Sequence, residues 1–538
     1  MRLAILALLL AAAAAAAAEP LTIQPYLGDG AVLQRGQPLR IAGSATPGVA
    51  VVLRIAGAQA SGTAAADGSW SVELPSLAAG GPHDLRIDAG GASLVLRDLL
   101  IGDVWLCSGQ SNMGFPMRDI AGAKRHLASL AGARIRLLRI RSRVADSPQA
   151  APAPDQGGWS RCEGEAAEGF SAVSIAFARA VQTGGEDVPI GLIQSNRAGT
   201  FCEAWIPRAA LEPTDDGRRI LARWAWLDAE RTRLTAAWQT EHDAWQAAHG
   251  RRFEQWKAMP VGGPFTPHEP ARPQAADSPL RPGVLWNGMI APLTGTALRG
   301  VLWYQGESNS DRPVQYRRLL SLLVSSWRAA FSDPQLPVIV AQLPEFETGS
   351  CPYDWQDQGP WEVLRDAQAA VAAEVPGVHL VVTLGLGERR DIHPREKWQV
   401  GARLARAALA NVHGRPMAWS GPRPLAMARD GRRWIVTVRD AGAGVATIDG
   451  RPPVGFVVAG SDRRFVPAAA EIVAADRIAV WSDAVPEAVA IRYAWDDDPA
   501  FNVVDPEGLP MAPFRSDDWP LPEAEAVVPF HRTWPEAP

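Results

Sequence analysis

A strand that ends in a serine turn constrains this chain more than any other segment. The apolar run from Ile101 to Cys107 predicts a short buried strand, and Gly109 after it allows the chain to turn sharply. Ser111 follows, and a nucleophilic serine needs this placement, with an exposed hydroxyl on rigid backbone and N–H groups nearby to hold an oxyanion. Met113 replaces the second glycine of Gly-x-Ser-x-Gly, which argues against the nucleophile elbow of the α/β-hydrolases. The remaining interpretations are another kind of serine nucleophile and an ordinary polar turn.

Length and charge narrow the classes of protein that fit. The chain has 538 residues, which is too long for one hydrophobic core and predicts two to four domains. Its formal net charge is −5 and its basic residues are scattered, so neither a nucleic acid nor an anionic membrane surface is an expected partner. Residues 1–18 combine a basic start, an apolar run and a tract of alanines, which predicts a secretory signal peptide cleaved after Ala18. We therefore expect a periplasmic or secreted protein without a membrane span.

The four cysteines, Cys107, Cys162, Cys202 and Cys351, do not have the spacing of metal ligands. Export would place them in a compartment that allows disulfides. Cys107 lies in the predicted strand before the serine and is expected to be buried. The sequence does not decide whether two of the other three form a disulfide.

The pattern of apolar residues divides the chain into three folded regions. Residues 19–98 contain short alternating strands, which predict an N-terminal β-sandwich. Residues 99–415 alternate strands with helices and predict an α/β domain with a parallel sheet and a helical insertion at about 215–275. Residues 416–538 return to short strands and predict a C-terminal β-domain with a proline-rich tail. Tryptophans recur at helical spacing in the insertion, and they either pack on the core or wall a substrate cleft.

Further polar blocks follow the serine motif in order along the chain. They are Gly191–Thr200, Glu203–Trp205, Gly300–Asn309 and Asp391–Lys397. Together with the serine motif they resemble the ordered blocks of the SGNH hydrolases. More narrowly, they resemble the sialate O-acetylesterase group, which includes bacterial acetylesterases acting on plant polysaccharides. The resemblance implies a flavodoxin-like, three-layer α/β fold with small all-β domains beside it and a site at the ends of the parallel strands.

This resemblance implies catalytic roles in the serine motif and in the Asp391–Lys397 block. Ser111 would be the nucleophile, and His393 would be the general base that activates it. Asp391 would orient the imidazole, although the acid in SGNH hydrolases usually lies three residues before the histidine, where this chain has Arg390. Glu388 or a backbone carbonyl is the alternative partner of the ring, and a Ser–His dyad is the third arrangement.

The resemblance also implies donors for the oxyanion that forms during attack. Two are the backbone N–H groups of Ser111 and Gly199. The third would be a side-chain amide of the Gly300–Asn309 block, for which Gln305 is predicted and Asn309 is the alternative. Glu307 is expected to brace this turn by hydrogen bonding.

These features together predict an exported serine esterase that hydrolyses O-acetyl esters on carbohydrates through an acetyl-enzyme on Ser111. Its substrate would be an O-acetylated oligosaccharide or a sialoglycan, and sialate esters and acetylated xylan or xyloglucan fit the motifs equally. No metal or organic cofactor is expected, because the sequence has no ligand cluster or phosphate loop. The alternatives are a catalytically inactive carbohydrate-binding protein and a short-chain lipase or esterase that does not act on sugars.

Overall fold

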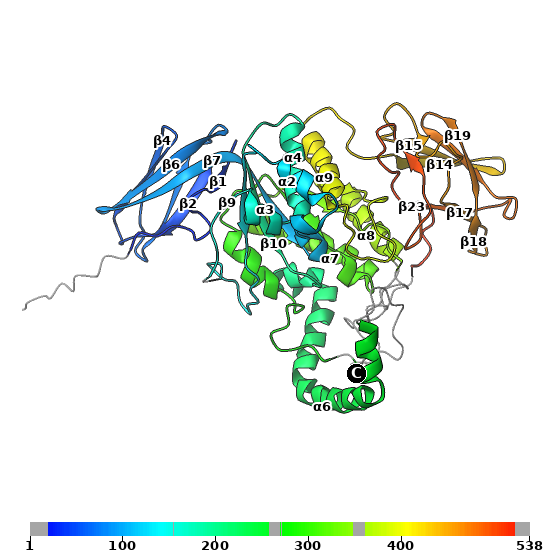
Figure 1. Ribbon diagram of the computed structural model, residues 1–538, viewed down its shortest axis with the longest axis horizontal. Helices are drawn as coiled ribbons and strands as arrows, with labels where there is room; N and C mark the ends of the chain where they lie inside the picture. Colours follow the sequence, from blue (N-terminus) through cyan, green and yellow to red (C-terminus); the bar gives the residue numbers. More distant parts are fainter. Residues whose placement is uncertain (1–19, 154, 258–269, 271, 348–360, 522–538) are drawn as a thin grey trace, which may run out of the picture.

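Seven strands form the central sheet, which lies between two β-rich regions (Figure 1). The computed structural model describes residues 20–153, 155–257, 270, 272–347 and 361–521. The strand order is β13-β12-β11-β7-β10-β8-β9, and every neighbouring pair is parallel except β8 with β9. The bounds of these strands are β7 (Ala92–Gly109), β8 (Ile135–Arg139), β9 (Ser160–Arg161), β10 (Ile190–Asn196), β11 (Gly300–Tyr304), β12 (Val338–Ala341) and β13 (Val378–Val381).

The strands of this sheet are apolar on both faces, which is typical of a parallel sheet covered by helices on both sides. Strands β8, β10, β11 and β12 are buried along most of their length. Helix α4 packs against α9, and α7 packs against α8. The helices and short turns of this region are α1 (Ser111–Gly114), η1 (Met117–Asp119), α2 (Ala123–Ala128), α3 (Gly164–Gly169), α4 (Ala172–Thr183), η2 (Cys202–Trp205), α5 (Arg208–Leu211), α6 (Asp215–Lys257), η3 (Trp286–Ile290), η4 (Ala291–Leu293), η5 (Glu307–Asn309), α7 (Pro313–Ala330), α8 (Trp361–Glu374) and α9 (Lys397–Asn411). The predicted α/β region with a mostly parallel sheet is confirmed.

One long strand joins the central sheet to the N-terminal β-region. Residues 92–101 of β7 pair with β6, and residues 103–109 pair with β10. The N-terminal strands are β1 (Val32–Gln34), β2 (Leu39–Ser44), β3 (Ala50–Ile55), β4 (Ala58–Thr63), β5 (Ser69–Leu74) and β6 (Gly80–Ala89). Their apolar side chains, including Leu53, Trp70 and Leu85, form a core of their own.

The C-terminal region is also all-β (Figure 1). Its sheets have the strand orders β14-β15-β20-β19, β18-β17-β21-β23 and β16-β22. The strands are β14 (Arg423–Asp430), β15 (Arg433–Arg439), β16 (Ala446–Thr447), β17 (Phe456–Ala459), β18 (Phe465–Pro467), β19 (Ala469–Ala474), β20 (Arg477–Trp481), β21 (Ala490–Tyr493), β22 (Val503–Val504) and β23 (Phe514–Arg515). Val436, Val458 and Tyr493 belong to a third core. Small all-β regions therefore flank the α/β region, as predicted.

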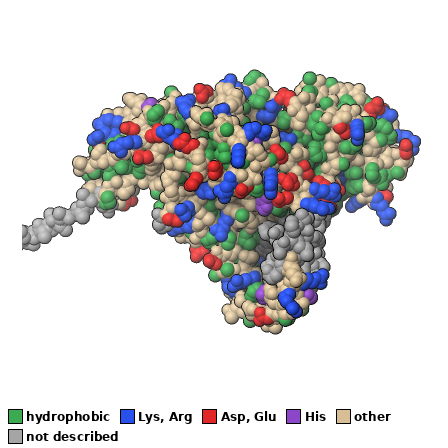
Figure 2. Space-filling view, in the orientation of Figure 1, with side chains coloured by type: hydrophobic (Ala, Val, Ile, Leu, Met, Phe, Trp, Pro, Cys, Tyr) green, Lys and Arg blue, Asp and Glu red, His purple; other side chains and the backbone are tan. Residues whose placement is uncertain are grey.

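Helix α6 extends away from the sheet and bends along its 43 residues (Figure 1). Trp224, Leu227, Leu234 and Trp245 are buried along it. Among the described residues, no helix combines the length and the apolarity needed to cross a membrane. The predicted signal peptide at residues 1–18 lies outside the described residues. On the face shown in Figure 2, acidic and basic side chains are interspersed.

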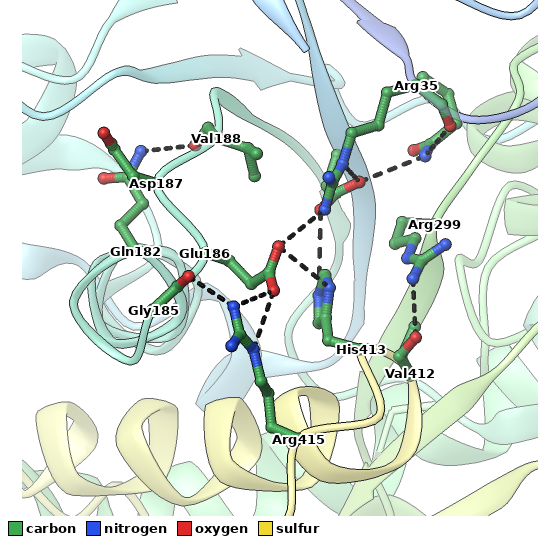
Figure 3. A network of polar contacts seen from close by, with 12 residues as sticks. Arg35, Gln182, Gly185, Glu186, Asp187, Val188, Arg299, Val412, His413 and Arg415 are labelled. Atoms are coloured by element: carbon green, nitrogen blue, oxygen red, sulfur yellow. Dashed lines mark hydrogen bonds and ion pairs between the residues drawn. The ribbon is translucent and has the colours of Figure 1, made fainter. Parts of the chain in front are cut away.

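A charged network joins three parts of the fold at the amino end of β10 (Figure 3). Asp103 of β7 is buried, and Arg35 from the N-terminal region donates to it at 2.9 Å. Arg35 also donates to Glu186, in the loop between α4 and β10, at 3.0 Å. Arg415, after α9, donates to the same carboxylate at 2.8 Å. Burial lowers the pKa of His413, which lies between these groups. The network therefore fixes the N-terminal region on the central sheet.

Candidate active site

Ser111 lies at the carboxyl ends of three adjacent parallel strands. Strand β7 ends at Gly109, which is in register with Asn196 of β10 and Tyr304 of β11. Gly109 has a φ of +134°, and a Cβ atom there would lie 2.1 Å from the Tyr304 carbonyl oxygen, so only glycine fits. Helix α1 begins at Ser111, two residues later. Open α/β sheets bind their ligands at this edge.

His393 reaches Ser111 from the loop before α9. Its Nε2 lies 2.8 Å from Ser111 Oγ, although the two residues are 282 positions apart. This distance allows a hydrogen bond, through which a base can take the hydroxyl proton. Burial lowers the pKa of His393, while Asp391 opposes this shift and Lys397 adds to it. A lowered pKa keeps the ring neutral near pH 7, which is the form that a base requires.

The carboxylate of Asp391 contacts the backbone of His393 instead of its ring. Asp391 Oδ1 accepts a hydrogen bond of 2.9 Å from the His393 N–H. Glu388 similarly accepts a bond of 2.7 Å from the backbone N–H of Arg395. Both carboxylates therefore shape the loop. The structure shows no hydrogen bond between His393 Nδ1 and another described residue.

The amide predicted to hold the oxyanion is engaged elsewhere. Gln305 is fully buried, and its Nε2 donates to the Thr200 carbonyl oxygen at 3.0 Å and to Asn309 Oδ1 at 2.7 Å. Asn309, the alternative donor, gives its Nδ2 hydrogen to Glu203 Oε2 at 3.0 Å. Since an amide nitrogen has two hydrogens, both N–H groups of Gln305 are committed to loop contacts. These bonds join the loop after β11 to the loop after β10.

Gly199 lies in the loop after β10, which is bonded to the serine turn. The Arg197 N–H donates to the Gly109 carbonyl at 3.2 Å, and Asn196 Nδ2 donates to the Gln110 carbonyl at 3.2 Å. Gly199 has a φ of +64°, and a Cβ atom on it would meet no atom within 4 Å. A side chain at this position would therefore meet open space, and the loop lies at the same edge of the sheet as the serine turn.

A cluster of buried polar side chains adjoins the Ser–His pair. Asn112 Nδ2 donates to Glu307 Oε1 at 2.5 Å and to the Ile392 carbonyl oxygen at 2.9 Å. Lys397 is also buried, and its Nζ donates to the Pro394 carbonyl oxygen. Burial raises the pKa of Glu307 and lowers that of Lys397 to about 7. The sequence predicts the bracing role of Glu307, but it does not indicate that Lys397 is buried, because a lysine that begins a helix is usually exposed.

A cavity of about 620 Å³ opens beside His393, which contacts Ser111. Its lining residues are Phe115, Arg118, Asp119, Ile120, Asp391, His393 and Arg395. One aromatic ring with several charged groups offers stacking and hydrogen bonds, which suit a sugar better than a long acyl chain.

Three of the four cysteines lie within the described residues. Cys107, Cys162 and Cys202 are buried free thiols, so no disulfide joins Cys162 to Cys202. Burial raises the thiol pKa of Cys107 and of Cys162 to about 12. Cys351 lies outside the described residues. Within the described ranges, no three His, Cys, Asp or Glu side chains are grouped as metal ligands would be.

Known proteins resemble this chain in sequence and in architecture. Residues 283–410, which include Gln305, Glu307 and His393, match the family model described as "Carbohydrate esterase, sialic acid-specific acetylesterase". The crystal structure of a carbohydrate acetylesterase from Xanthomonas citri matches with a TM-score of 0.75 and 31% identity, over 93% of this chain and 100% of that chain. This chain belongs to the carbohydrate O-acetylesterase family that includes the sialate O-acetylesterases.

Mammalian members of this acetylesterase family are more distant. The sialate O-acetylesterase of Rattus norvegicus is 28% identical over 384 residues, which is 66% of each chain. The enzyme of Homo sapiens is 27% identical over 430 residues, which is 74% of this chain and 72% of the human one. The family resemblance predicted from the sequence blocks is confirmed, and so is the prediction of a carbohydrate O-acetylesterase.

The structure of this acetylesterase brings some of the predicted site residues together and turns one of them elsewhere. Ser111 and His393 are in contact, and Asp391 lies in the same loop as the histidine. Gly199 lies at the same edge of the sheet in a left-handed backbone conformation. Gln305 is turned toward Thr200 and Asn309.

Proposed function

We propose that this protein is a serine esterase that hydrolyses O-acetyl esters on carbohydrates through an acetyl-enzyme on Ser111. The observation that carries the proposal is the 2.8 Å contact between Ser111 Oγ and His393 Nε2. Membership of a carbohydrate O-acetylesterase family supports an acetyl ester as the bond that is cleaved. The charged and aromatic lining of the adjoining cavity supports a sugar as the alcohol part.

In the proposed reaction, His393 Nε2 takes the proton of Ser111 Oγ as that oxygen attacks the acetyl carbonyl carbon. The electron pair of the carbonyl moves onto its oxygen, and the backbone N–H groups of Ser111 and Gly199 hold the resulting oxyanion. When the intermediate collapses, the bond to the sugar oxygen breaks and that oxygen receives the proton from His393. Water then attacks the acetyl-enzyme with His393 again as base, which releases acetate and free serine.

The supporting roles follow from the hydrogen bonds. We propose that Asp391 acts on His393 through the loop backbone and through its charge, which raises the pKa of the histidine. Gln305 is proposed to hold the loop of Gly199 through the Thr200 carbonyl. This role replaces the direct contact with the oxyanion that the sequence predicts for Gln305.

We further propose an SGNH hydrolase domain with a three-layer, flavodoxin-like arrangement at residues 99–415, with α6 as its insertion. The β-domains would occupy residues 19–98 and 416–538, and the three separate apolar cores support this division. The composition of residues 1–18 supports export to the periplasm or the medium. Sequencing the amino terminus of the exported protein tests this point, and Glu19 is the expected first residue.

The proposed function is tested by acetate release from acetylated sialosides, xylan, xyloglucan and pectin. We expect at least one of them to be hydrolysed, together with short aryl acetates. Activity should fall for acyl chains beyond about four carbons, because each extra methylene in a tight site costs about 1–3 kcal/mol. A preference for octanoate would favour the lipase alternative. A protein that binds these glycans without hydrolysis and without labelling by a phosphonate probe would be the inactive binding protein.

A further inference from the structure

The loop that carries His393 is held at four consecutive residues. Each of them gives one backbone group to a side chain, and the pairs are Ile392 O with Asn112 Nδ2, His393 N with Asp391 Oδ1, Pro394 O with Lys397 Nζ, and Arg395 N with Glu388 Oε1. The two N–H groups are bonded by carboxylates of the loop itself. The two carbonyl oxygens are bonded by buried side chains from α1 and from the start of α9. The histidine is therefore anchored on both sides.

Asn112 connects this loop to the nucleophile. It follows Ser111 directly in α1 and is 1% exposed. Its Nδ2 gives one hydrogen to Ile392 O, next to His393, and the other to Glu307 Oε1. Because one short side chain joins the serine helix to the histidine loop, it constrains the separation of Ser111 Oγ and His393 Nε2.

Lys397 holds the other side of the histidine. Its side chain is fully buried, and its Nζ lies 5.1 Å from the ring centre of Phe115 and 6.0 Å from that of Tyr304. Pro394 has no N–H, so its carbonyl is the one backbone group through which it can be bonded. A hydrocarbon side chain would fill the same space without desolvating an amine, so what the amine adds is its positive charge and its bond to Pro394.

We propose that Asn112 and Lys397 are positioning residues, which aim the His393 imidazole at Ser111 by holding the carbonyl oxygens on either side of the histidine. The inference rests on the proposed function, since it explains how the base of that reaction is oriented. In a Ser–His–Asp triad, a carboxylate on Nδ1 supplies this orientation. Here the backbone of the loop supplies it.

Lys397→Met tests the inference, because it removes the donor and the charge while keeping most of the side-chain length. We expect kcat on an aryl acetate to fall about 10–100-fold with KM within about twofold, since a misplaced base slows the chemical step without weakening binding. The acid limb of the kcat/KM profile should also move to higher pH. Lys397 lowers the pKa of His393, so loss of its positive charge raises that pKa.

Several charged groups act on the pKa values of His393 and Lys397. Asp391 and Lys397 act on His393, and Glu307, Asp391 and Glu388 act on Lys397. All of these groups except Lys397 itself are kept in Lys397→Met, so the shift of the limb reports the one charge removed. Lys124→Met, at an exposed position of α2, is the matched control and should leave both kcat and the limb unchanged.

A second pair of variants separates positioning from folding. Lys397→Met combined with Glu307→Gln removes both charges of the buried cluster, so neither remains without its counter-charge. We expect this double variant to fold and still to be slow. Asn112→Ala should slow kcat in the same way from the other side of the histidine.

Assaying Ser111→Ala beside these variants distinguishes failure of the proposed function from failure of the positioning inference. Full activity of Ser111→Ala would overturn the proposed function. If Ser111→Ala is inactive while folded Lys397→Met keeps kcat within twofold of the wild type and an unmoved acid limb, the positioning inference alone is overturned.

Discussion

The side chain of Gln305 donates a hydrogen bond of 3.0 Å to the carbonyl oxygen of Thr200, the residue directly after Gly199. The same amide nitrogen donates to Asn309 Oδ1, which also accepts the Cys202 N–H at 2.9 Å. The loop after β11 thus holds the loop after β10 at two points, the Thr200 carbonyl and the Cys202 N–H. Gln305 therefore supports the backbone of the Gly199 loop, which is proposed to hold the oxyanion.

Gln305→Ala should lower both stability and rate. It leaves the buried Thr200 carbonyl without this donor, and an unsatisfied buried group costs about 1–3 kcal/mol. Asn309 Oδ1 loses one of its two donors and keeps the Cys202 N–H. We expect kcat to fall because the loop of Gly199 loses its brace, with KM changing less. Thermal unfolding and steady-state kinetics measured together check this expectation.

The matched control is Gln335→Ala, at an exposed position before β12, which should change neither quantity. A loss of about 10²–10³-fold in kcat at unchanged stability would have another meaning. It would show that the Gln305 amide contacts the oxyanion directly, as the sequence predicts.

The sequence predicts the position of Ser111 well because local pattern decides it. An apolar run followed by a glycine places the serine at the end of β7, and the structure adds that Tyr304 leaves no room for a Cβ atom at Gly109. The meeting of Ser111 with His393 follows from the family resemblance and from the rule that such blocks gather at one edge of the sheet.

The direction of side chains is what the sequence cannot predict. The amide of Gln305 could point toward Ser111 or away from it, and the choice depends on where Thr200 lies, more than a hundred residues earlier. Lys397 carries no local sign of burial, because its surroundings are Phe115, Tyr304 and the carbonyl of Pro394. Those contacts exist only in the folded chain.

Ser111→Ala and His393→Ala should each abolish nearly all acetate release. In the proposed reaction both residues act in one proton-coupled attack, so the double variant should be no slower than either single variant. Rates are compared at equal folded concentration, judged by circular dichroism. A double variant slower than either single variant by the product of their losses would mean that the two residues act independently.

The pH profile should reflect the neutral form of His393. Burial lowers the pKa of this histidine, so the ring remains unprotonated to a lower pH than an exposed histidine, which titrates near 6.5. The acid limb of kcat/KM is therefore expected below that value, with activity lost as the pH falls through it. A limb above 6.5 would contradict the direction of the shift, and a rate that is flat down to about pH 4 would identify another group as the base.

Asp391→Asn should slow the enzyme only modestly, because an amide oxygen can accept the same hydrogen bond from the His393 N–H that the carboxylate accepts. Asp391→Ala removes this acceptor and should cost more. Asp391 raises the pKa of His393, so loss of its charge should also move the acid limb to lower pH, opposite to the effect of Lys397→Met. Steady-state pH profiles of the three variants check the signs. A loss of about 10⁴-fold in Asp391→Asn would mean that the carboxylate holds the imidazole ring itself during turnover.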